Sequence, residues 1–404
     1  MDLVFFALPR HDGDYSSTSY SLAKELSREH RVFYIENPHT YLDYFRMRSN
    51  EEIQNRKNAL LKGKDIYTKI EDFPNLTIVT PQLVVPINWL SQGQLYNALS
   101  KVNDKIVFKT LKKVKEDFSL KDFIFINSFN PLFGKSFIDK IGAKLFIYHT
   151  VDDISQAAYL YKHGLDLENE MVQLADLTIT TSKELKKLKS DYGKYIYHLP
   201  NACEVELFKR AHEDLAKPEE IKDVVGTLVT YTGNIEERVN YKLCLELAQQ
   251  HKDKTFLYVG PLNSQEPDKN GLLKQENVRF IGARDLTQLP AYLKYSDCAI
   301  IPFAYNKQTK SIYPLKINEY LASGTPVVST RFSDDINDFE DVANLVQTDE
   351  EFVLEVDKAI NEDSNEKRNK RIEKSESNSW SHRAKEFWEI LELYQKESGT
   401  KLEL

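Results

Sequence analysis

The chain has 404 residues, more than one ordinary hydrophobic core supports, so two domains are expected. Hydrophobic residues make up 41% and charged residues 29%, as in folded proteins, and the net charge of -8 disfavours nucleic-acid binding, which needs a basic surface. Cys203, Cys244 and Cys298 are widely spaced without a metal-ligand pattern, so we expect three packed thiols in a reducing compartment.

Short apolar runs recur through the first half of the chain, usually separated by segments with helical periodicity. The predicted strands are residues 3–8, 32–35, 76–80, 123–126, 145–148, 177–181 and 195–199. The predicted helices are residues 17–28, 97–117, 167–175 and 183–191. This alternation predicts a parallel sheet with helices on its faces, in a first Rossmann-like domain over residues 1–208.

A second series of the same kind follows. Its predicted strands are residues 227–231, 255–259, 278–281, 298–301, 327–329 and 343–346, and its helices are 241–251, 286–295, 315–323 and 352–361. Residues 365–379 are polar and charged, and no helix is assigned to them. We expect a second doubly wound domain over residues 209–379 and a final amphipathic helix within residues 380–404, whose buried face carries Phe387, Ile390, Leu391 and Tyr394.

Ligands of open parallel sheets bind outside the carboxyl ends of the strands. In the second half, the strand 227–231 runs into Gly233 and then Arg238. A glycine lets backbone amides approach a phosphate, and arginine can hold phosphate oxygens in a bidentate contact. An ordinary glycine turn followed by a solvated charge cluster is the commoner meaning of such a pattern.

A second phosphate signal lies in residues 305–330. Lys316 falls in the first turn of a predicted helix, where a cation opposes the helix dipole unless an anion binds there. Glu319, one turn further on, can accept hydrogen bonds from ribose hydroxyls. A surface Lys/Glu pair on an ordinary helix explains the two residues equally well.

Five blocks in order narrow the interpretation: GNIEERVN at 233–240, FLYVGP at 256–261, NVRFIG at 277–282, LPAYLKYSDCAIIPF at 289–303 and PLKINEYLASGTPVVST at 314–330. This series resembles the donor domain of family-four-like GT-B glycosyltransferases, closest to the bacterial branch that builds surface polysaccharides. Upstream, HTVDDIS at 149–155 and LPNACEVELF at 199–208 resemble the end of that family's acceptor domain. The resemblance covers roughly residues 148–330.

The resemblance implies a GT-B fold with a nucleotide-diphosphate sugar held between two domains, and a last helix that crosses back onto the first domain. Gly233, Arg238 and Lys316, with the amides around Pro314 and Leu315, would bind the diphosphate. Glu319 matches the second acid of the family's E-x7-E pattern and would bind the ribose. The turn that contains Gly260 and the loop that ends at Arg284 would flank the base. The nucleotide-sugar is a co-substrate, so no cofactor is expected.

One position departs from the family pattern. Retaining members usually carry a glutamate eight residues before Glu319, and this chain has Ser311 there. Serine can donate a hydrogen bond, but it is no carboxylate partner for a developing oxocarbenium ion. The sequence therefore leaves open whether the enzyme retains or inverts the anomeric configuration, and it does not identify the sugar, the base, the acceptor or the oligomeric state.

The first domain supplies the catalytic candidates. An inverting transferase needs a base for the acceptor hydroxyl proton, and Asp12, His11 and Asp152 follow predicted strands. His149 resembles the histidine near the sugar in related enzymes, so we expect His149 and Asp12 to be catalytic. Asp152 and Asp153 could suggest a metal site, but GT-B enzymes stabilise the leaving diphosphate with Arg, Lys and helix amides. No bound metal is predicted.

Three other functions stay open. A nucleotide-sugar epimerase on the same scaffold would act on the donor alone, although no second acid–base pair is evident near Glu319. A non-catalytic polysaccharide-assembly subunit would bind donor without turnover, with Ser311 as its symptom. A dinucleotide oxidoreductase is the weakest alternative, because no G-x-G-x-x-G motif follows either first strand.

A basic pattern in the predicted helix 97–117 concerns the acceptor. Lys101, Lys105, Lys109 and Lys112 recur at three- and four-residue steps in an otherwise acidic protein. A solvated lysine face is the ordinary explanation. The alternative is a peripheral contact with anionic lipid. We expect a cytoplasmic protein, and the hypothesis is that it attaches to the inner membrane face. Its acceptor would then be a saccharide or a lipid-linked saccharide.

Overall fold

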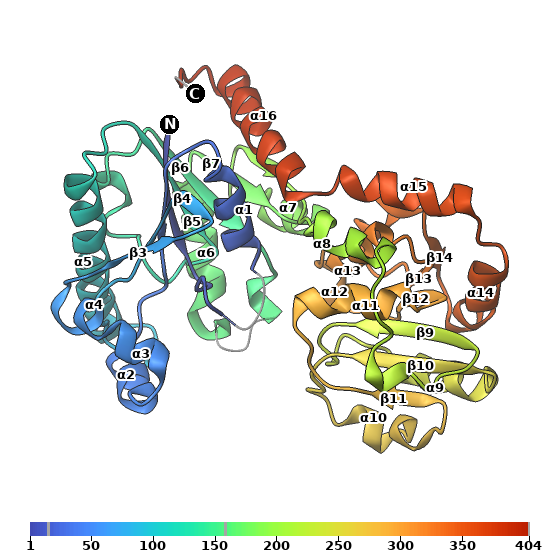
Figure 1. The fold of residues 1–404 in the computed structure, drawn as a ribbon. Coiled ribbons are helices and arrows are strands. Elements are labelled where there is room, and N and C mark those ends of the chain that lie inside the picture. The colour runs from blue at the N-terminus through green and yellow to red at the C-terminus, as the bar shows by residue number, and fades with distance from the viewer. Residues whose placement is uncertain (14–16, 157–159, 403–404) are drawn as a thin grey trace. The chain divides into compact units, whose positions relative to one another are not determined.

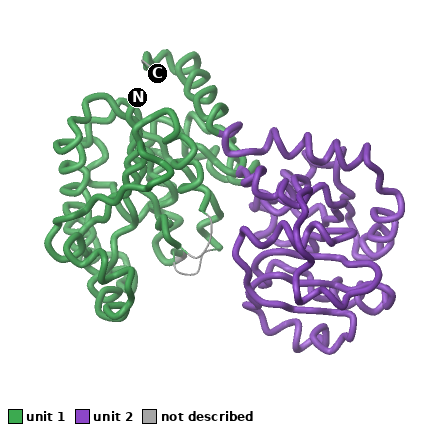
Figure 2. Tube along the Cα trace, viewed as in Figure 1, with its two compact units in different colours: residues 1–200, 384–404 green, residues 201–383 purple. Residues whose placement is uncertain are grey.

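The computed structural model describes residues 1–13, 17–156 and 160–402. The chain divides into two compact units (Figure 2), one made of residues 1–200 and 384–404 and one of residues 201–383. Each unit contains its own mainly parallel sheet with helices, which confirms the predicted class of two doubly wound α/β domains. The sequence placed the boundary after residue 208, but α8 (Val205–Lys209) contacts α11 (Leu289–Lys294) and α13 (Leu315–Ala322), so it belongs to the second unit.

The sheet of unit 1, several of whose strands are labelled in Figure 1, has the strand order β3-β4-β2-β1-β5-β6-β7-β8. Its strands are β1 (Asp2–Ala7), β2 (Val32–Ile35), β3 (Tyr67–Ile70), β4 (Phe73–Val79), β5 (Phe123–Ser128), β6 (Leu145–Thr150), β7 (Leu177–Thr180) and β8 (Ile196–His198). Among the strands that the structure describes in this unit, only β3 pairs antiparallel, and it lies at the edge of the sheet. The chain leaves β1 toward β2 on one side and later returns to β5 on the other, so the topological switch point lies between β1 and β5.

The helices of unit 1 are α1 (Thr18–Leu26), α2 (Tyr41–Met47), α3 (Glu51–Asn55), α4 (Lys57–Lys62), α5 (Gln94–Asp117), α6 (Tyr161–Leu174) and α7 (Lys183–Lys189). Ser17 and Ser182 cap α1 and α7 by accepting backbone N–H groups. The sequence analysis assigned no helix to the stretch that contains α2. Thr40 starts that helix through a capping box with Asp43, a signal available in the sequence but not used.

The sheet of unit 2 is wholly parallel, with the order β11-β10-β9-β12-β13-β14. Its strands are β9 (Thr227–Thr232), β10 (Lys254–Val259), β11 (Val278–Phe280), β12 (Cys298–Ile301), β13 (Val327–Thr330) and β14 (Asn344–Val346). The switch point of this unit lies between β9 and β12. The predicted strands of both units are therefore confirmed, except that β3 was not foreseen.

The remaining helices of unit 2 are α9 (Tyr241–Gln250), α10 (Glu266–Lys269), α12 (Lys307–Lys310), α14 (Asp349–Asn361) and α15 (Asn365–Glu376). No helix was assigned at α15, because the sequence there has no apolar face. The structure explains it: Arg371 is buried and donates from Nε and Nη2 to the carbonyl of Gly324, at 3.0 and 2.8 Å, and Nη2 also contacts Asp363.

The final helix, α16 (Trp380–Ser398), contains the point at Ala384 where the chain rejoins unit 1. Phe387, Ile390, Leu391 and Tyr394 are all buried, which confirms the predicted apolar face. Within unit 1, the Tyr394 ring meets Tyr195 edge-on with centroids 5.1 Å apart.

Cys203, Cys244 and Cys298 are free and buried, as predicted, and all three lie in unit 2. Burial raises the pKa of each thiol, that of Cys244 to about 12. These cysteines therefore behave as small core residues rather than as reactive groups. None of the helices that the structure describes combines the length and the apolar character needed to span a bilayer.

Candidate active site

In unit 2, two predicted phosphate-binding residues meet at the switch point of the sheet. Gly233 directly follows β9, and Lys316 is the second residue of α13. A Cβ atom built on Gly233 would lie 2.6 Å from Cε and 2.7 Å from Nζ of Lys316. Any larger residue at 233 would therefore displace the ammonium group. Two segments far apart in the sequence thus form one cradle with a cation in it.

A second close approach ties the β9 turn to the β10 turn. A Cβ atom on Gly260 would lie 1.9 Å from the carbonyl oxygen of Gly233, and Gly233 N–H donates to the Val259 carbonyl at 2.7 Å. Gly260 also forms a bridge to Gly282, which follows β11. The glycines at 233, 260 and 282 therefore let three strand ends approach closely, because no side chains stand between them.

The start of α13 is arranged for an anion. Pro314 is the N-cap residue and offers no side-chain cap, the first turn contains no acidic residue, and the Leu315 amide is already bonded to the Tyr313 carbonyl at 2.9 Å. The positive end of the helix dipole and Lys316 thus lie together without a carboxylate in that turn.

Aromatic rings hold the Lys316 ammonium. Its Nζ lies 5.4 Å from the centroid of the Tyr231 ring and 5.7 Å from that of Phe303. Burial, reinforced by the charge of Arg238, lowers the pKa of Lys316 to about 8. The sequence analysis missed both rings, because each belongs to an apolar run that ends a strand and looks like ordinary core.

Glu319 lies one turn after Lys316 on α13. Burial raises the pKa of Glu319 to about 7, against the opposing effect of the Lys316 charge. Near neutral pH, therefore, Lys316 and Glu319 are each only partly in their charged form. Such shifted pKa values are typical of a pocket that is completed by a charged ligand.

Arg238 has a carboxylate partner in this structure. Its guanidinium forms an ion pair with Glu236, whose other oxygen accepts from Asn234 Nδ2 at 2.6 Å. Ala304 N–H donates to the Arg238 carbonyl at 2.9 Å, which fixes the backbone of this loop beside the end of β12. Glu236 thus occupies the donors that a phosphate would use, a relation that the sequence analysis did not foresee.

The two other predicted donor-site residues are engaged elsewhere. Arg284 pairs with Glu220 and donates to the Tyr292 hydroxyl at 3.1 Å, so its guanidinium stabilises the local fold. Ser311 is buried and donates to the Gln308 carbonyl at 2.9 Å. The roles assigned to both residues stay predictions.

In unit 1, His149 is the second-to-last residue of β6 and is buried, with 1% of its surface exposed. Its Nδ1 lies 2.8 Å from Ser128 Oγ, which is 2.6 Å from Ser19 Oγ. Burial lowers the pKa of His149 to about 4, so the ring is neutral near pH 7. The expected contact between His149 and a sugar stays a prediction.

Asp12 and His11 lie at the switch point of unit 1 but have different partners. The Asp12 carboxylate accepts from Arg56 Nη2 at 2.6 Å. Burial opposes ionisation of Asp12, but the hydrogen bond and charge of Arg56 outweigh it, so the pKa of Asp12 is lowered. A carboxylate held in this way is a weak base.

His11 forms a dyad with Glu36. Its Nδ1 lies 2.7 Å from Oε1 of Glu36, and its backbone N–H donates to the same oxygen at 3.2 Å. Glu36 is buried and follows β2 directly, and its Oε2 accepts from Thr80 Oγ1 at 3.3 Å. With the proton on Nδ1, the imidazole presents the lone pair of Nε2, an arrangement suited to general base catalysis.

The same residues offer ligand atoms that an ion could share. Among the described residues, His11, Asp12 and Glu36 place one ligand atom each within 4.8 Å of one another. Arg56 contacts both carboxylates, at 2.6 Å from Asp12 and 3.6 Å from Glu36. Its guanidinium therefore supplies the positive charge that these carboxylates require.

Part of the chain matches a known protein family. Residues 226–362 match the family model described as glycosyl transferases group 1. This segment is a group 1 glycosyl transferase domain. It contains Gly233, Arg238, Lys316 and Glu319, and it lies wholly within unit 2.

One curated relative matches part of the chain. Over 168 residues the chain is 30% identical to a Bacillus subtilis protein named as a teichuronic acid biosynthesis glycosyltransferase, TuaH. The match covers 40% of this chain and 42% of the relative. The matched segment therefore spans less than half of the length of that protein.

Solved structures match the whole fold. A sucrose-phosphate synthase from Thermosynechococcus elongatus has a TM-score of 0.66 at 13% identity, with 99% of this chain and 100% of that chain covered. A trehalose-6-phosphate structure from E. coli, bound with UDP-2-fluoro glucose, has a TM-score of 0.67 at 13% identity, with 98% and 99% covered. An α,α-trehalose 6-phosphate synthase from Burkholderia multivorans has a TM-score of 0.70 at 10% identity, with 98% and 99% covered. The fold is that of the GT-B glycosyltransferases.

Proposed function

We propose that this protein transfers a sugar from a nucleotide-diphosphate sugar to a saccharide or lipid-linked acceptor in bacterial surface-polysaccharide synthesis. The observation that carries the proposal is the contact of Gly233 with Lys316 at the switch point of the group 1 domain. The name of the Bacillus subtilis relative supports the polysaccharide role, and the UDP-sugar in the E. coli structure supports the class of donor.

The donor would bind through charge and backbone. Lys316 and the start of α13 would hold the diphosphate, with Arg238 joining when the phosphate displaces Glu236. Glu319 would accept hydrogen bonds from the ribose hydroxyls. Lys316 and Arg238 supply the positive charge that stabilises a leaving diphosphate, so we propose neither a metal ion nor a cofactor beyond the co-substrate.

For the acceptor hydroxyl, we assign the base to His11 and keep Asp12 as a neighbouring acceptor-site residue. His11 Nε2 would take the proton, and the Glu36 carboxylate would stabilise the imidazolium that results. Asp12, with its lowered pKa and its Arg56 partner, is better suited to orient His11, whose Nδ1 lies 3.8 Å from its carboxylate. His149, buried behind Ser128, would stabilise the ends of β5 and β6 and contact the sugar only at the base of the site.

The donor assignment is tested by a thermal-shift panel of UDP-, GDP-, CMP- and dTDP-sugars, because a ligand that binds the folded state raises the melting temperature. One class of nucleotide should stabilise the wild type, and Glu319→Ala should remove most of that shift. Glu373→Ala, on the exposed side of α15, is the matched control. Equal shifts for the wild type and Glu319→Ala would place the nucleotide elsewhere.

Transfer is then measured with the stabilising donor and a panel of saccharide and lipid-extract acceptors. A new glycoside supports the proposal, whereas a new sugar nucleotide formed without an acceptor indicates an epimerase. Binding without any turnover indicates an assembly subunit. The anomeric proton of the product, read by NMR, tests the base: we expect inversion and a loss of about a hundredfold or more in rate for His11→Ala. Retention with full activity of that variant would exclude His11.

We also propose that the protein attaches peripherally to anionic membrane, and the surface of α5 supports this attachment. Leu95, Ala98 and Val102 continue along the helix into Lys105, Lys109 and Lys112, and all six side chains are exposed. Trp89, just before the helix, is 72% exposed. An apolar segment with an exposed tryptophan, followed by lysines along the same face, suits the boundary between acyl chains and anionic headgroups.

Sedimentation with anionic liposomes tests this attachment. The wild type should sediment at low salt and dissociate at high salt, and the change of Lys105, Lys109 and Lys112 to Glu should abolish binding. A variant with Lys186, Lys187 and Lys242 changed to Glu has the same net charge and should bind as the wild type does. Equal recovery of all three proteins in the supernatant at low salt would refute membrane attachment. It would not bear on the proposed transfer activity.

A further inference from the structure

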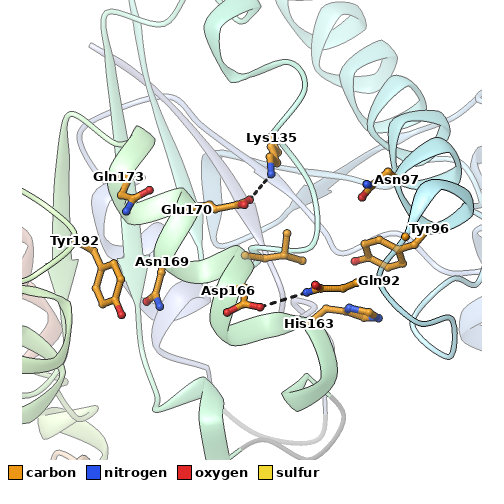
Figure 3. Close-up of a pocket in the computed structure, with 12 residues that line it drawn as sticks. Gln92, Tyr96, Asn97, Lys135, His163, Asp166, Asn169, Glu170, Gln173 and Tyr192 are labelled. Carbon is orange, nitrogen blue, oxygen red and sulfur yellow. Dashed lines mark hydrogen bonds and ion pairs between the residues drawn. The ribbon is translucent and has the colours of Figure 1, made fainter.

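A polar groove in unit 1 is used by none of the roles above. It opens between α5 and α6 with a volume of about 760 Å³ (Figure 3), which is within the range of roughly 300–1,000 Å³ for small-ligand sites. Neither His11 nor any partner of His11 lines it. The groove is therefore a separate site from the dyad.

Polar and charged side chains make up most of the lining of the groove. It contains four amide side chains, two tyrosines, one histidine and three charged groups, namely Gln92, Asn97, Asn169, Gln173, Tyr96, Tyr192, His163, Lys135, Asp166 and Glu170. Gly93 and Leu167 complete it. Amides donate and accept hydrogen bonds at once, as sugar hydroxyls do, and tyrosine adds a flat ring with a polar end.

A contact between α5 and α6 fixes one wall of the groove. The Tyr96 and His163 rings stack with centroids 4.2 Å apart, and both residues are buried. His163 Nε2 donates to the Leu90 carbonyl at 2.9 Å, which sets the orientation of the ring. Figure 3 shows the Tyr96 hydroxyl directed toward the middle of the groove.

The charged groups in the groove largely satisfy one another. Lys135 Nζ lies 2.6 Å from a Glu170 oxygen, and Gln92 Nε2 donates to Asp166 at 3.3 Å. One lysine faces two carboxylates, so the groove has an excess of negative charge. Phosphates and uronic acids would be repelled, whereas a neutral ligand would lose nothing.

Three exposed side chains are left for a ligand, in addition to the Tyr96 hydroxyl. Within the described part of the chain, the structure gives the side chains of Asn97, Gln173 and Tyr192 no hydrogen-bond partner, and all three are exposed. Gln173 and Tyr192 lie toward one end of the groove and Asn97 at the other, with the Lys135–Glu170 pair between them (Figure 3). A ligand that contacts all three must be extended, uncharged and rich in hydroxyl groups.

We propose that this groove binds a neutral segment of the growing saccharide, away from the hydroxyl that reacts. The inference rests on the proposed transfer to a saccharide acceptor, because an enzyme that extends a polymer gains affinity by holding more than the terminal sugar. The pyranose faces would stack on Tyr192, and the amides and Asp166 would bind hydroxyls.

Saturation-transfer NMR and calorimetry of the full-length protein, without donor, test the groove. The probes are cellohexaose and chitohexaose as neutral chains and hexagalacturonate as an anionic chain of equal length. At least one neutral hexamer should bind with little dependence on salt, because no net charge is paired. Tyr192→Ala and Gln173→Ala should each weaken it by about tenfold, as the loss of an aromatic stack or a hydrogen bond predicts.

Gln249→Ala is the matched control, an exposed glutamine in the last turn of α9 in unit 2, and it should bind as the wild type does. The nucleotide-sugar thermal shift should be unchanged in all variants, which separates this proposal from the donor site. Binding of neither neutral hexamer, binding of hexagalacturonate alone, or equal affinity in Tyr192→Ala and Gln173→Ala would overturn the proposal. If the wild type bound no nucleotide-sugar, that result would instead refute the proposed function.

Discussion

The affinity for the nucleotide-sugar should depend on pH in a bell-shaped way. In the proposed donor site, Glu319 would bind ribose hydroxyls best when ionised, and its pKa is raised to about 7. Lys316 would bind the diphosphate only when protonated, and its pKa is lowered to about 8. Affinity should therefore be highest near pH 7.5, fall as Glu319 gains a proton below pH 7, and fall again as Lys316 loses its proton above pH 8.

The size of the effect follows from these two values. At one pH unit beyond either pKa, about one tenth of the group is in the binding form, so affinity should drop about tenfold, or about 1.4 kcal/mol, at pH 6 and again at pH 9. Binding should also release a proton on the acid side and take one up on the alkaline side, because the ligand stabilises ionised Glu319 and protonated Lys316.

Calorimetry between pH 5.5 and 9.5, in buffers with different heats of ionisation, measures both the affinity and the protons exchanged. The nucleotide-sugar is the right ligand, because its diphosphate lacks the terminal phosphate that titrates near pH 6. Glu319→Gln should lose the acid limb and keep the alkaline one, and Lys316→Gln should show the reverse. A flat profile in the wild type, or an acid limb that survives in Glu319→Gln, would refute the assignment of these two residues.

Three further predictions concern the same pocket. Glu236→Gln should tighten nucleotide-sugar binding several-fold, because it frees the Arg238 guanidinium; weaker binding in a titration would show that Glu236 contacts the ligand itself. Gly233→Ala should abolish the nucleotide thermal shift while circular dichroism stays native, since the new Cβ would displace Lys316, and a preserved shift would contradict the cradle. Without ligand, Glu319→Gln should be more stable than the wild type by about 2 kcal/mol at pH 8, with the gain shrinking toward pH 5, because the raised pKa destabilises the ionised folded state. Denaturant titrations at both pH values measure this difference, and a gain that does not depend on pH would exclude ionisation of Glu319 as its cause.

The sequence predicts the fold well because buried parallel strands are continuous apolar runs. Two of the missed elements have clear physical causes. Strand β3 is only half-buried at the sheet edge, so Tyr67–Ile70 alternates weakly. Helix α15 buries an arginine, and a hydropathy pattern cannot show that Arg371 is satisfied by the Gly324 carbonyl.

The candidate site was predictable where backbone position decides. Gly233 and Lys316 could be placed together because strand ends and helix starts meet at the switch point of the sheet. The partners of side chains could not be predicted. The pairing of His11 with Glu36 joins residues 25 positions apart. The ion pair between Glu220 and Arg284 could not be predicted from the sequence either.

The location of the three cysteines makes unit 2 observable separately from unit 1. Cys203, Cys244 and Cys298 are the only thiols of the chain, and all are buried in residues 201–383. A thiol reagent therefore reacts only when unit 2 opens, and the rate of labelling reports the free energy of that opening. Unit 1 contributes no signal, so a labelling experiment in the presence of a nucleotide-sugar would directly measure how far the sugar nucleotide stabilises unit 2, the proposed donor-binding half. Mass spectrometry would resolve the labelling at the start of β12, within α9 and in the segment before α8.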